Sequence, residues 1–461
     1  MARRNLFSRH NTVILTACLV LAGAGTSATL TNAQTPPAAP RSASPQELQA
    51  EADALFRRML VKPNDLDAAF RFSEIESGLG DYEAAIGALE RMLFYNNGLD
   101  RVKLELGLLY FKLGSYEQAR SYFSAALDGG PPGDVRQRIT SFLREIDRRL
   151  SVHQFAGFAQ IGLRSQSNAN AGPDSAIVRA LGFAATLDPK FTRKRDGNVF
   201  ATSRLSYIYD FENQRGDVWE TNYTGYNTRQ FKYSSLNLGL VELDTGPRLT
   251  LGEASGLTVR PYAIGNVVTL GDRPYLAAAG GGVSARMNTD FGLTLEPGIE
   301  ARARGFKNST SYPTATDQQG NQFTASLAIN APLAFVNGLK WQSRLSYVRI
   351  SARNKAYSAD QVGIEVSLPY EFDMPFGQSG QRWTFAPFAS YAQTNYAQVN
   401  PIVDPLTKRR DREWHAGATL DMALYQNFGF AIQAQYQRIE SSLANYRTHN
   451  FIVSGGPTVR F

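Results

Sequence analysis

The sequence predicts a two-part α+β protein, in which N-terminal α-helical repeats precede an antiparallel transmembrane β-barrel of about 14 strands, with 16 as the alternative count. Three observations predict it. A 34-residue repeat lies before residue 152, apolar and polar residues alternate with period two from residue 153 onward, and the chain begins with a short apolar segment. At 461 residues the chain is long enough for more than one structural unit.

The overall composition excludes several classes of protein. A mean hydropathy of −0.29 excludes a bundle of hydrophobic membrane helices, whereas alternation in a barrel hides apolar residues from such averages. The formal charge of +7 includes three N-terminal arginines, so without them it is 7 − 3 = +4, which does not favour nucleic acid as a partner. One Cys and four His rule out a disulfide framework and a Cys-rich metal site.

The first residues have the pattern of a secretory signal peptide. Three arginines precede an apolar run at 12–28, and residues 31–33 supply a small-x-Ala cleavage site. The run is short for a membrane anchor, so residues 1–33 are predicted to be a signal peptide. Lipidation of Cys18 is the alternative. The Pro- and Ala-rich residues 34–45 are predicted to be a disordered linker.

Residues 46–152 repeat themselves at a helical-solenoid period. The segment LGDYE at 79–83 recurs as LGSYE at 113–117, and the same step of 34 residues carries Leu89 to Phe123. Repeats of this length are typical of stacked helix–turn–helix units, which bury a continuous core between neighbours. We therefore predict a helical domain over this range.

The second copy of the repeat resembles the tetratricopeptide (TPR) pattern. Gly107 and Ala119 are its small residues, which allow close helix approach, and Phe123 is a large one that fills the gap. The first copy departs from the pattern, because Glu76 stands where the repeat has Tyr. A final helix over 135–152 is expected to cap the array.

In TPR arrays the first helix of each repeat lines the concave face. An apolar groove with basic residues would suit a peptide or an unfolded client protein. Ordinary core and surface roles are the alternative for each residue. The predicted client-binding residues are Phe70, Glu74, Arg101, Leu104, Leu108, Phe111 and Lys112.

Residues 153–461 alternate as strands do. In 291–305 the polar face carries Glu296, Glu300, Arg302 and Arg304, and in 199–211 it carries Arg204. A soluble β-barrel and a transmembrane one both give this pattern, with opposite faces turned inward.

Three features favour the transmembrane barrel. Many runs reach 12 or more residues, whereas strands in soluble proteins usually have about five or six. Aromatic residues such as Trp341, Trp383 and Trp414 lie near strand ends, as interfacial girdles require. The last strand ends on Phe461, which resembles the C-terminal assembly signal of bacterial outer-membrane proteins.

We count about fifteen strand-like runs, and bacterial barrels normally have an even number. The misjudged boundary is expected within 235–270. The five charged residues named above, Arg204, Glu296, Glu300, Arg302 and Arg304, are predicted to line the lumen, which at this strand number is too wide for side chains alone to fill. The polar segments 308–319, 373–380 and 398–412 are predicted to be cell-surface loops.

The sequence carries no pattern of an enzyme or a cofactor site. The four His are scattered, and no nucleophile elbow, phosphate loop or dinucleotide fingerprint occurs. We therefore expect no catalytic, cofactor-binding or metal-binding residues, and we interpret His415 as a polar residue of the lumen.

The domain order and one local motif resemble a known family. The first strand, 155–164, runs into a turn containing Ser167, Asn168 and Asn170. A signal peptide, a short TPR region and a barrel that begins this way resemble the surface lipoprotein assembly modulator (Slam) family. The motif itself is interpreted either as a structured first loop or as a client contact.

The resemblance implies a translocon in the outer membrane of a Gram-negative bacterium. Its TPR domain would be periplasmic, and its barrel would deliver client proteins, surface lipoproteins above all, to the cell surface. The implied partners are the client, outer-membrane lipids and the barrel-assembly machinery. Two alternatives stay open: an exopolysaccharide export porin, and a passive outer-membrane pore whose TPR domain recruits a periplasmic partner.

Overall fold

The computed structural model describes residues 45–213, 215–252, 256–289, 291–333, 335–375 and 381–461. The predicted signal peptide and residues 34–44 of the predicted linker lie outside this range. The chain forms two compact units that divide between Gln154 and Phe155, and each is described by itself.

Six helices make up the described part of the N-terminal unit: α2 (Pro45–Val61), α3 (Leu66–Leu79), α4 (Tyr82–Tyr95), α5 (Asp100–Lys112), α6 (Tyr116–Asp128) and α7 (Gly133–Leu150). Each helix packs on the next one along the chain, as in a TPR solenoid. None of the helices described is both long and apolar enough to cross a membrane.

The repeated LGDYE motif is the turn between α3 and α4. Gly80 ends α3 in the left-handed conformation at φ 93°, which only glycine adopts without strain. Asp81 then caps α4, because its side chain accepts a hydrogen bond from the backbone N–H of Ala84 at 2.9 Å. One short motif therefore stops one helix and starts the next.

The core of the second repeat depends on a glycine. A methyl group added to Gly107 on α5 would lie 2.7 Å from the ring of Phe123 on α6, so the ring occupies the space that a side chain would need. Phe123 is fully buried and stacks on Phe142 of α7, with ring centroids 5.2 Å apart. The final helix also buries Ile139 and Ile146, and so closes the array.

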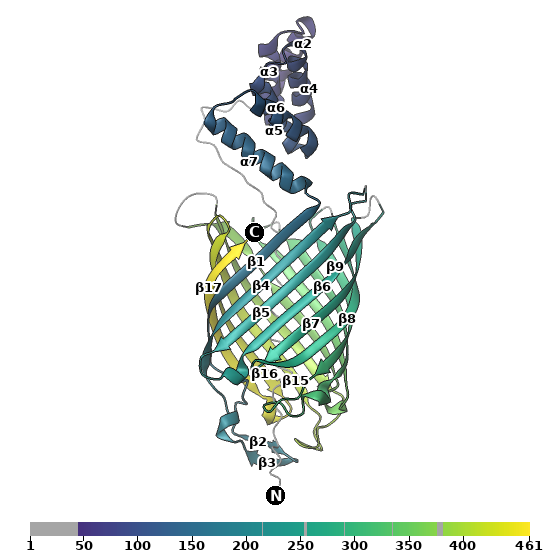
Figure 1. Cartoon of the computed structure of the whole chain (residues 1–461), viewed down its shortest axis with the longest axis vertical. Helices are drawn as coiled ribbons and strands as arrows, with labels where there is room; N and C mark the ends of the chain where they lie inside the picture. Colours follow the sequence, from purple (N-terminus) through teal and green to yellow (C-terminus); the bar gives the residue numbers. More distant parts are fainter. Residues whose placement is uncertain (1–44, 214, 253–255, 290, 334, 376–380) are drawn as a thin grey trace. The chain divides into compact units, whose positions relative to one another are not determined.

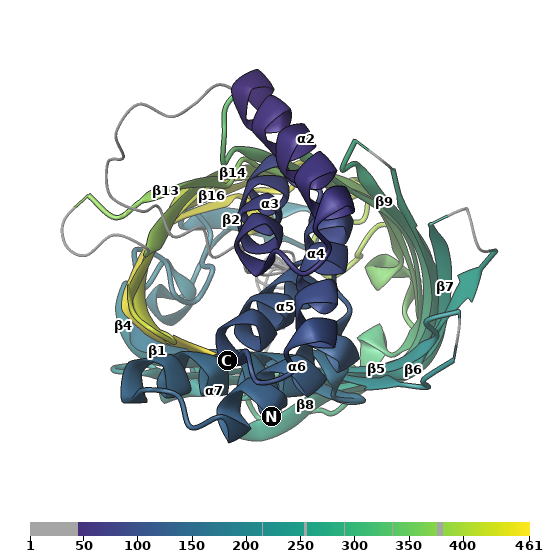
Figure 2. The ribbon, with the colours of Figure 1, turned by 90° about the horizontal axis from the view of Figure 1, so that it is seen from above.

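The second unit is a closed antiparallel barrel. Its strands are β1 (His153–Gln166), β4 (Asp196–Asp210), β5 (Val218–Gln230), β6 (Leu238–Leu251), β7 (Leu257–Leu270), β8 (Arg273–Asn288), β9 (Thr294–Phe306), β10 (Gly320–Pro332), β11 (Lys340–Ala352), β12 (Ala359–Ser367), β13 (Tyr370–Asp373), β14 (Arg382–Tyr396), β15 (Arg410–Tyr425), β16 (Phe428–Ser441) and β17 (Thr448–Arg460). β1 pairs with β17, and β12 pairs with both β11 and β14, so the sheet has no free edge (Figures 1 and 2).

The strand number agrees with the preferred prediction. β12 and β13 both pair with β14 and follow each other closely, so they are two segments of one strand. The described barrel therefore has fourteen strands, which confirms the preferred prediction of fourteen and not the alternative of sixteen. The expectation of a misjudged boundary within 235–270 is wrong, because that range holds two regular strands, β6 and β7.

Short elements occupy the connections of the barrel. A separate two-stranded hairpin pairs β2 (Ile177–Ala180) with β3 (Phe183–Thr186). The short 3-10 helices are η2 (Pro189–Phe191), η3 (Ser234–Leu236), η4 (Ala315–Gln318), η5 (Lys355–Tyr357) and η6 (Ala444–Tyr446).

The strands turn their apolar faces outward. On β6, Val241 and Leu243 are 48% and 46% exposed, and on β9 Ile299 is 54% exposed. The intervening charged residues point inward, and Arg248 is only 7% exposed. A closed barrel with an apolar exterior and a polar interior fits an outer-membrane protein, since lipid offers no partner to polar groups.

The two ends of the barrel differ. At the end that holds the first residues of β1 and the last of β17, here called the terminal end, the connections are short, such as 252–256 and 426–427. The other end, here called the loop end, carries the long connections 167–195, 307–319 and 397–409. Residues 308–319 and 398–412 lie at the loop end, but Asp373, where the third predicted surface loop (373–380) begins, pairs with Arg382 at the terminal end. The prediction that all three segments share one side of the membrane is therefore wrong for Asp373, and residues 376–380 lie outside the described range.

Candidate functional site

The predicted client-binding residues of the helical unit fall into two groups. Phe70, Glu74, Arg101 and Lys112 lie at its surface or partly exposed. The Arg101 guanidinium lies over the ring of Phe70 at 4.9 Å, and Lys112 lies over the ring of Tyr82 at 5.1 Å. Through these cation–π pairs, the surface formed by α3, α5 and the start of α4 presents both aromatic and basic groups.

The other three residues contribute to the core. Leu104, Leu108 and Phe111 pack against the buried cluster formed by α6 and α7. The ring of Phe111 meets that of Phe142 on α7 edge to face, at 5.2 Å. Phe70 packs in the same way against the buried cluster of α2 to α5, so all four side chains combine a core contact with an exposed part.

The first-strand motif is a tightly bonded turn at the loop end of the barrel. The Asn168 amide is buried, and its nitrogen donates to the Gly172 carbonyl and the Thr448 hydroxyl, both at 2.8 Å. Its oxygen accepts from the Gly172 N–H at 2.9 Å. Ser167 bonds the side chain of Asn450 at 3.2 Å, and Asn170 donates to the carbonyl of Thr192 at 2.8 Å. The motif thus fastens the first loop to β17.

Phe461 lies at the seam between the first and last strands. Its backbone exchanges hydrogen bonds of 2.8 and 3.1 Å with Gly157 of β1, and its ring covers the place where a Gly157 side chain would lie. Its own side chain is 59% exposed. The C-terminal residue therefore completes the pairing that closes the barrel.

All five predicted lumen residues lie on the inward face. The strand registers place Arg204 on the inner face of β4, and Glu296, Glu300, Arg302 and Arg304 on the inner face of β9. Arg304 lies near the loop end, over the ring of Phe306 at 5.0 Å. The structure groups three of the five with charged residues of four neighbouring strands.

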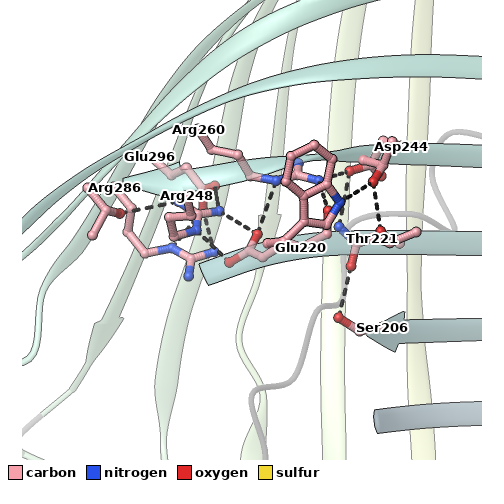
Figure 3. A network of polar contacts seen from close by, with 12 residues as sticks. Ser206, Glu220, Thr221, Asp244, Arg248, Arg260, Arg286 and Glu296 are labelled. Atoms are coloured by element: carbon pink, nitrogen blue, oxygen red, sulfur yellow. Dashed lines mark hydrogen bonds and ion pairs between the residues drawn. The ribbon is translucent and has the colours of Figure 1, made fainter. Parts of the chain in front are cut away.

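Near the terminal end these charges form a network across β5 to β9 (Figure 3). Arg248 grips the Glu220 carboxylate with two hydrogen bonds of 2.6 and 3.0 Å, in the fork geometry that favours Arg over Lys. Arg260 is ion-paired with Glu220 at 3.2 Å and also with Asp244. Both arginines are under 10% exposed. Their side chains therefore lie along the inner surface of the barrel, where the carboxylates pair with them.

The network continues onto β8 and β9. Arg286 is ion-paired with Glu296 at 3.3 Å, and Arg248 reaches the same carboxylate at 3.7 Å. Each carboxylate of the group has an arginine partner. We call the whole set the paired-charge wall: Glu220, Glu242, Asp244, Arg248, Arg260, Arg286, Glu296, Glu300 and Arg302.

A second row of the wall lies further from the terminal end. Arg302 on β9 donates to Glu242 on β6 at 2.6 Å, and it also pairs with its neighbour Glu300. Of the strands between them, β8 presents Gly280 and Gly282 inward, opposite Arg302 and Glu300 in the register. A side chain at Gly280 would meet the backbone of Ala301 and Arg302, and one at Gly282 would meet the Tyr262 ring, so neither position has room for a larger residue.

The opposite inner wall is richer in neutral amides. His415 of β15 is 3% exposed, and its Nε2 lies 2.7 Å from Glu413, which also accepts from the Gln437 amide at 3.0 Å. Gln433 and Gln435 of β16 project inward beside them. Among the residues that the structure describes, no group of three His, Cys, Asp or Glu could hold a metal ion.

The paired-charge wall can keep a lumen hydrated without favouring ions of one sign. The wall has five carboxylates and four arginines, a formal charge of 4 − 5 = −1, and every carboxylate contacts an arginine. The two signs therefore lie side by side, and the wall lacks the strong single-sign field that focuses small ions of opposite charge. Such a wall suits a solute of mixed charge, and it does not form the acidic ring expected of a conduit for cationic polysaccharide.

Sequence reasoning missed six members of this wall: Glu220, Glu242, Asp244, Arg248, Arg260 and Arg286. The signal was present, since charged or amide residues occupy every second position from Glu220 to Asn222 and from Glu242 to Asp244. The unclear strand boundaries within 235–270 account for the four members in that range, whereas Glu220 and Arg286 lie outside it.

Comparisons with known proteins match different parts of the chain. The model of a family described as a protein of unknown function (DUF2860) matches residues 307–458, which lie within the barrel. No protein with a curated description matches the chain.

Several solved structures resemble the helical part of the chain. One is the type III secretion chaperone SycD of Yersinia enterocolitica in complex with a peptide of the translocator YopD (13% identity, 23% of this chain and 84% of that chain, TM-score 0.22). Others are the first TPR of Spaghetti (RPAP3) bound to an HSP90 peptide (17%, 23% and 81%, 0.21) and PcrH in complex with the chaperone-binding region of PopD (16%, 23% and 83%, 0.21). At these scores the likenesses carry no argument about function.

Proposed function

We propose that this protein is an outer-membrane translocation factor, which takes client proteins, surface lipoproteins in particular, from the periplasm and delivers them to the cell surface. The helical unit captures a partly unfolded client, and the barrel is the conduit. Membrane assembly or transport is the broader class, and the nature of the client is the specific part of the proposal.

The observation that carries the proposal is the direct covalent connection of a TPR-like unit to the first strand of a closed barrel. α7 ends at Leu150 and β1 begins at His153, so only Ser151 and Val152 separate the two units. A tether this short keeps anything bound by the helices near the terminal end of the barrel, at a high effective concentration.

The connection lengths support an orientation. Bacterial outer-membrane barrels have short periplasmic turns and longer extracellular loops. We therefore assign the terminal end to the periplasm and the loop end, with its connections 167–195, 307–319 and 397–409, to the cell surface. The TPR-like unit, which precedes β1 at the terminal end, is then periplasmic.

The paired-charge wall supports a polypeptide as the transported solute. An unfolded client presents both signs of charge and many amide groups. A wall of nearly balanced, interspersed charges, facing the glutamines of β16, neither strongly traps nor strongly repels either sign. A wall with one sign of charge would favour small ions or a charged polymer.

The test is surface exposure of a lipoprotein encoded beside this chain. In cells that carry the protein, externally added protease should remove the lipoprotein, whereas in cells without it the lipoprotein should stay protected at unchanged total abundance. Equal protease sensitivity in both strains would contradict the proposal.

A chain that keeps the barrel but lacks the helices is the matched control. Residues 153–461 behind the same signal peptide should insert in the membrane and fail to expose the lipoprotein, because client capture is lost. Conductance in planar bilayers separates the alternatives: a steadily open pore favours passive transport, and a closed one favours a gated translocon.

A further inference from the structure

A cavity of about 130 Å³ lies inside the barrel at its loop end. The inner faces of β1, β4 to β7, β16 and β17 form its walls, and the turn 168–171 borders it as well. Amide side chains dominate its lining. They belong to Gln166, Asn168, Asn198, Gln230, Gln433, Gln435, Gln437 and Asn450, and no carboxylate is among the lining residues.

The first-strand turn makes one side of the cavity rigid. Asn168 uses its amide within the turn and on β17, as described above, and its backbone N–H donates to the Asn450 side chain at 2.9 Å. The His449 ring, also in the lining, is held between Asp174 and Arg193. These groups are already bonded, so they shape the cavity and do not supply contacts to a ligand.

Two polar atoms of the lining residues have no hydrogen-bond partner within the described part of the chain. The Oδ1 atom of Asn198 and the Nε atom of Arg164 are buried and make no hydrogen bond there. Burying a polar atom without a partner is costly. One is an acceptor and the other a donor, and both lie just behind the accessible surface of the cavity. A small rotation of the side chains would let them pair with a ligand, or ordered water, that both donates and accepts.

Two further amides face the same space. Gln435 and Gln166 lie on either side of Ile452 in the register of β16, β17 and β1, and within the described residues no hydrogen bond of their side chains is recorded. Each amide offers two donors and one acceptor. Together with Asn198 they surround the cavity with unengaged neutral hydrogen-bonding groups.

We propose that this cavity binds one unit of a neutral saccharide. A sugar ring carries hydroxyl groups that donate and accept at once, which matches the unpaired Asn198 acceptor and Arg164 donor as well as the amides. An anion would satisfy only the donors and would leave the Asn198 acceptor unpaired. The single lining arginine also donates through Nη1 to the Tyr226 hydroxyl and lies over Phe200 at 4.7 Å, so it does not present its whole guanidinium to the cavity. The site goes beyond the proposed function, because it needs no client protein.

The first test is binding of D-glucose, D-galactose and N-acetylglucosamine to the full chain in an amine-oxide detergent, which contains no sugar. Saturation-transfer NMR should detect at least one of them. Gln435→Leu should weaken that binding about fivefold, as expected when one hydrogen bond between neutral groups is lost. Asn198→Leu is the second variant, in case the first disturbs the fold.

Gln342→Leu is the matched control. Gln342 is an inward amide of β11 that does not line the cavity, so its loss should leave sugar binding unchanged. The proposal is overturned if no sugar binds, if only inorganic phosphate or glucuronate binds, or if the three variants bind sugar equally, which would place the binding elsewhere.

Chain length then identifies the source of the saccharide. If the cavity contacts a polysaccharide that passes through the lumen, maltohexaose should bind much more tightly than glucose, because neighbouring units add contacts along the wall. If it receives one terminal unit of a surface glycan, the two affinities should be similar. A failure of client exposure would leave these results intact, so the two proposals fail separately.

Discussion

Arg302 on β9 reaches Glu242 on β6 across two intervening strands, with 2.6 Å between Nη1 and Oε2. The contact joins residues 60 positions apart in the sequence. On β8, next to β9, the inward positions opposite Arg302 and Glu300 are Gly280 and Gly282. The inner wall of the barrel is therefore braced by side chains in addition to its backbone ladder.

Removing one member of this pair should destabilise the barrel. Glu242→Gln removes one charged partner of Arg302, whose side chain is only 16% exposed. We therefore expect a loss of roughly 1–3 kcal/mol in the free energy of unfolding. The double variant Glu242→Gln/Arg302→Gln should recover part of it. Urea unfolding followed by tryptophan fluorescence measures this cycle, and strictly additive losses would show that the pair is not coupled.

The Gly107–Phe123 contact predicts a steric effect in the helical unit. Gly107→Ala places a methyl group 2.7 Å from the Phe123 ring, which should reduce the free energy of unfolding by about 1–3 kcal/mol. Gly87→Ala on α4 is the matched control, since nothing lies within 4 Å of its added methyl. It should stabilise the helix by about 0.5–1 kcal/mol. Thermal unfolding of residues 45–152 measures both effects. Equal changes in the unfolding temperature for the two variants would contradict the close packing of Gly107 on Phe123.

Glu76 should make the helical unit sensitive to pH. Burial raises the pKa of its carboxyl group, and the charges of Asp81 and Asp53 raise it further. Because the folded-state pKa is above the unfolded one, the contribution of Glu76 is fully present below the ordinary value of 4.5 and is lost as pH rises through the raised pKa. Glu76→Gln should therefore raise the unfolding temperature at neutral pH and change it little below pH 4.5. An equal change at both would refute this.

The turn motif predicts a local defect. Asn168→Ala leaves the Gly172 N–H without its buried partner and removes one of the two hydrogen bonds that the Gly172 carbonyl accepts, the other coming from Thr448, so it should cost about 1–3 kcal/mol. We expect faster proteolysis within 167–195 while the barrel stays folded. Asn321→Ala, an exposed outward position of β10, is the control. Unchanged proteolysis of the Asn168 variant would show that the turn does not depend on this amide.

The sequence predicted the architecture well because both units repeat a simple physical pattern. The 34-residue step predicted the close packing at Gly107. Period-two alternation predicted which residues of β9 share a face, and the long runs and terminal aromatic residues favoured the polar face as the inner one. Contacts between distant strands were not predictable. The partnership of Arg302 with Glu242 depends on the register of four strands, which alternation alone does not contain. The core role of Phe111 depends on how α7 packs, which the repeat period does not specify.

Photo-crosslinking from two adjacent positions of β10 tests the central claim most directly. Ser326 faces the lumen, opposite Gly298 and Ser346, and Leu327 faces outward, opposite Pro297 and Leu345. A photoreactive phenylalanine analogue at position 326 should crosslink to a lipoprotein client during its export, whereas the same analogue at position 327 should crosslink to lipid only. Equal crosslinking from both positions, or none from position 326 while the client still reaches the surface, would contradict passage through the barrel.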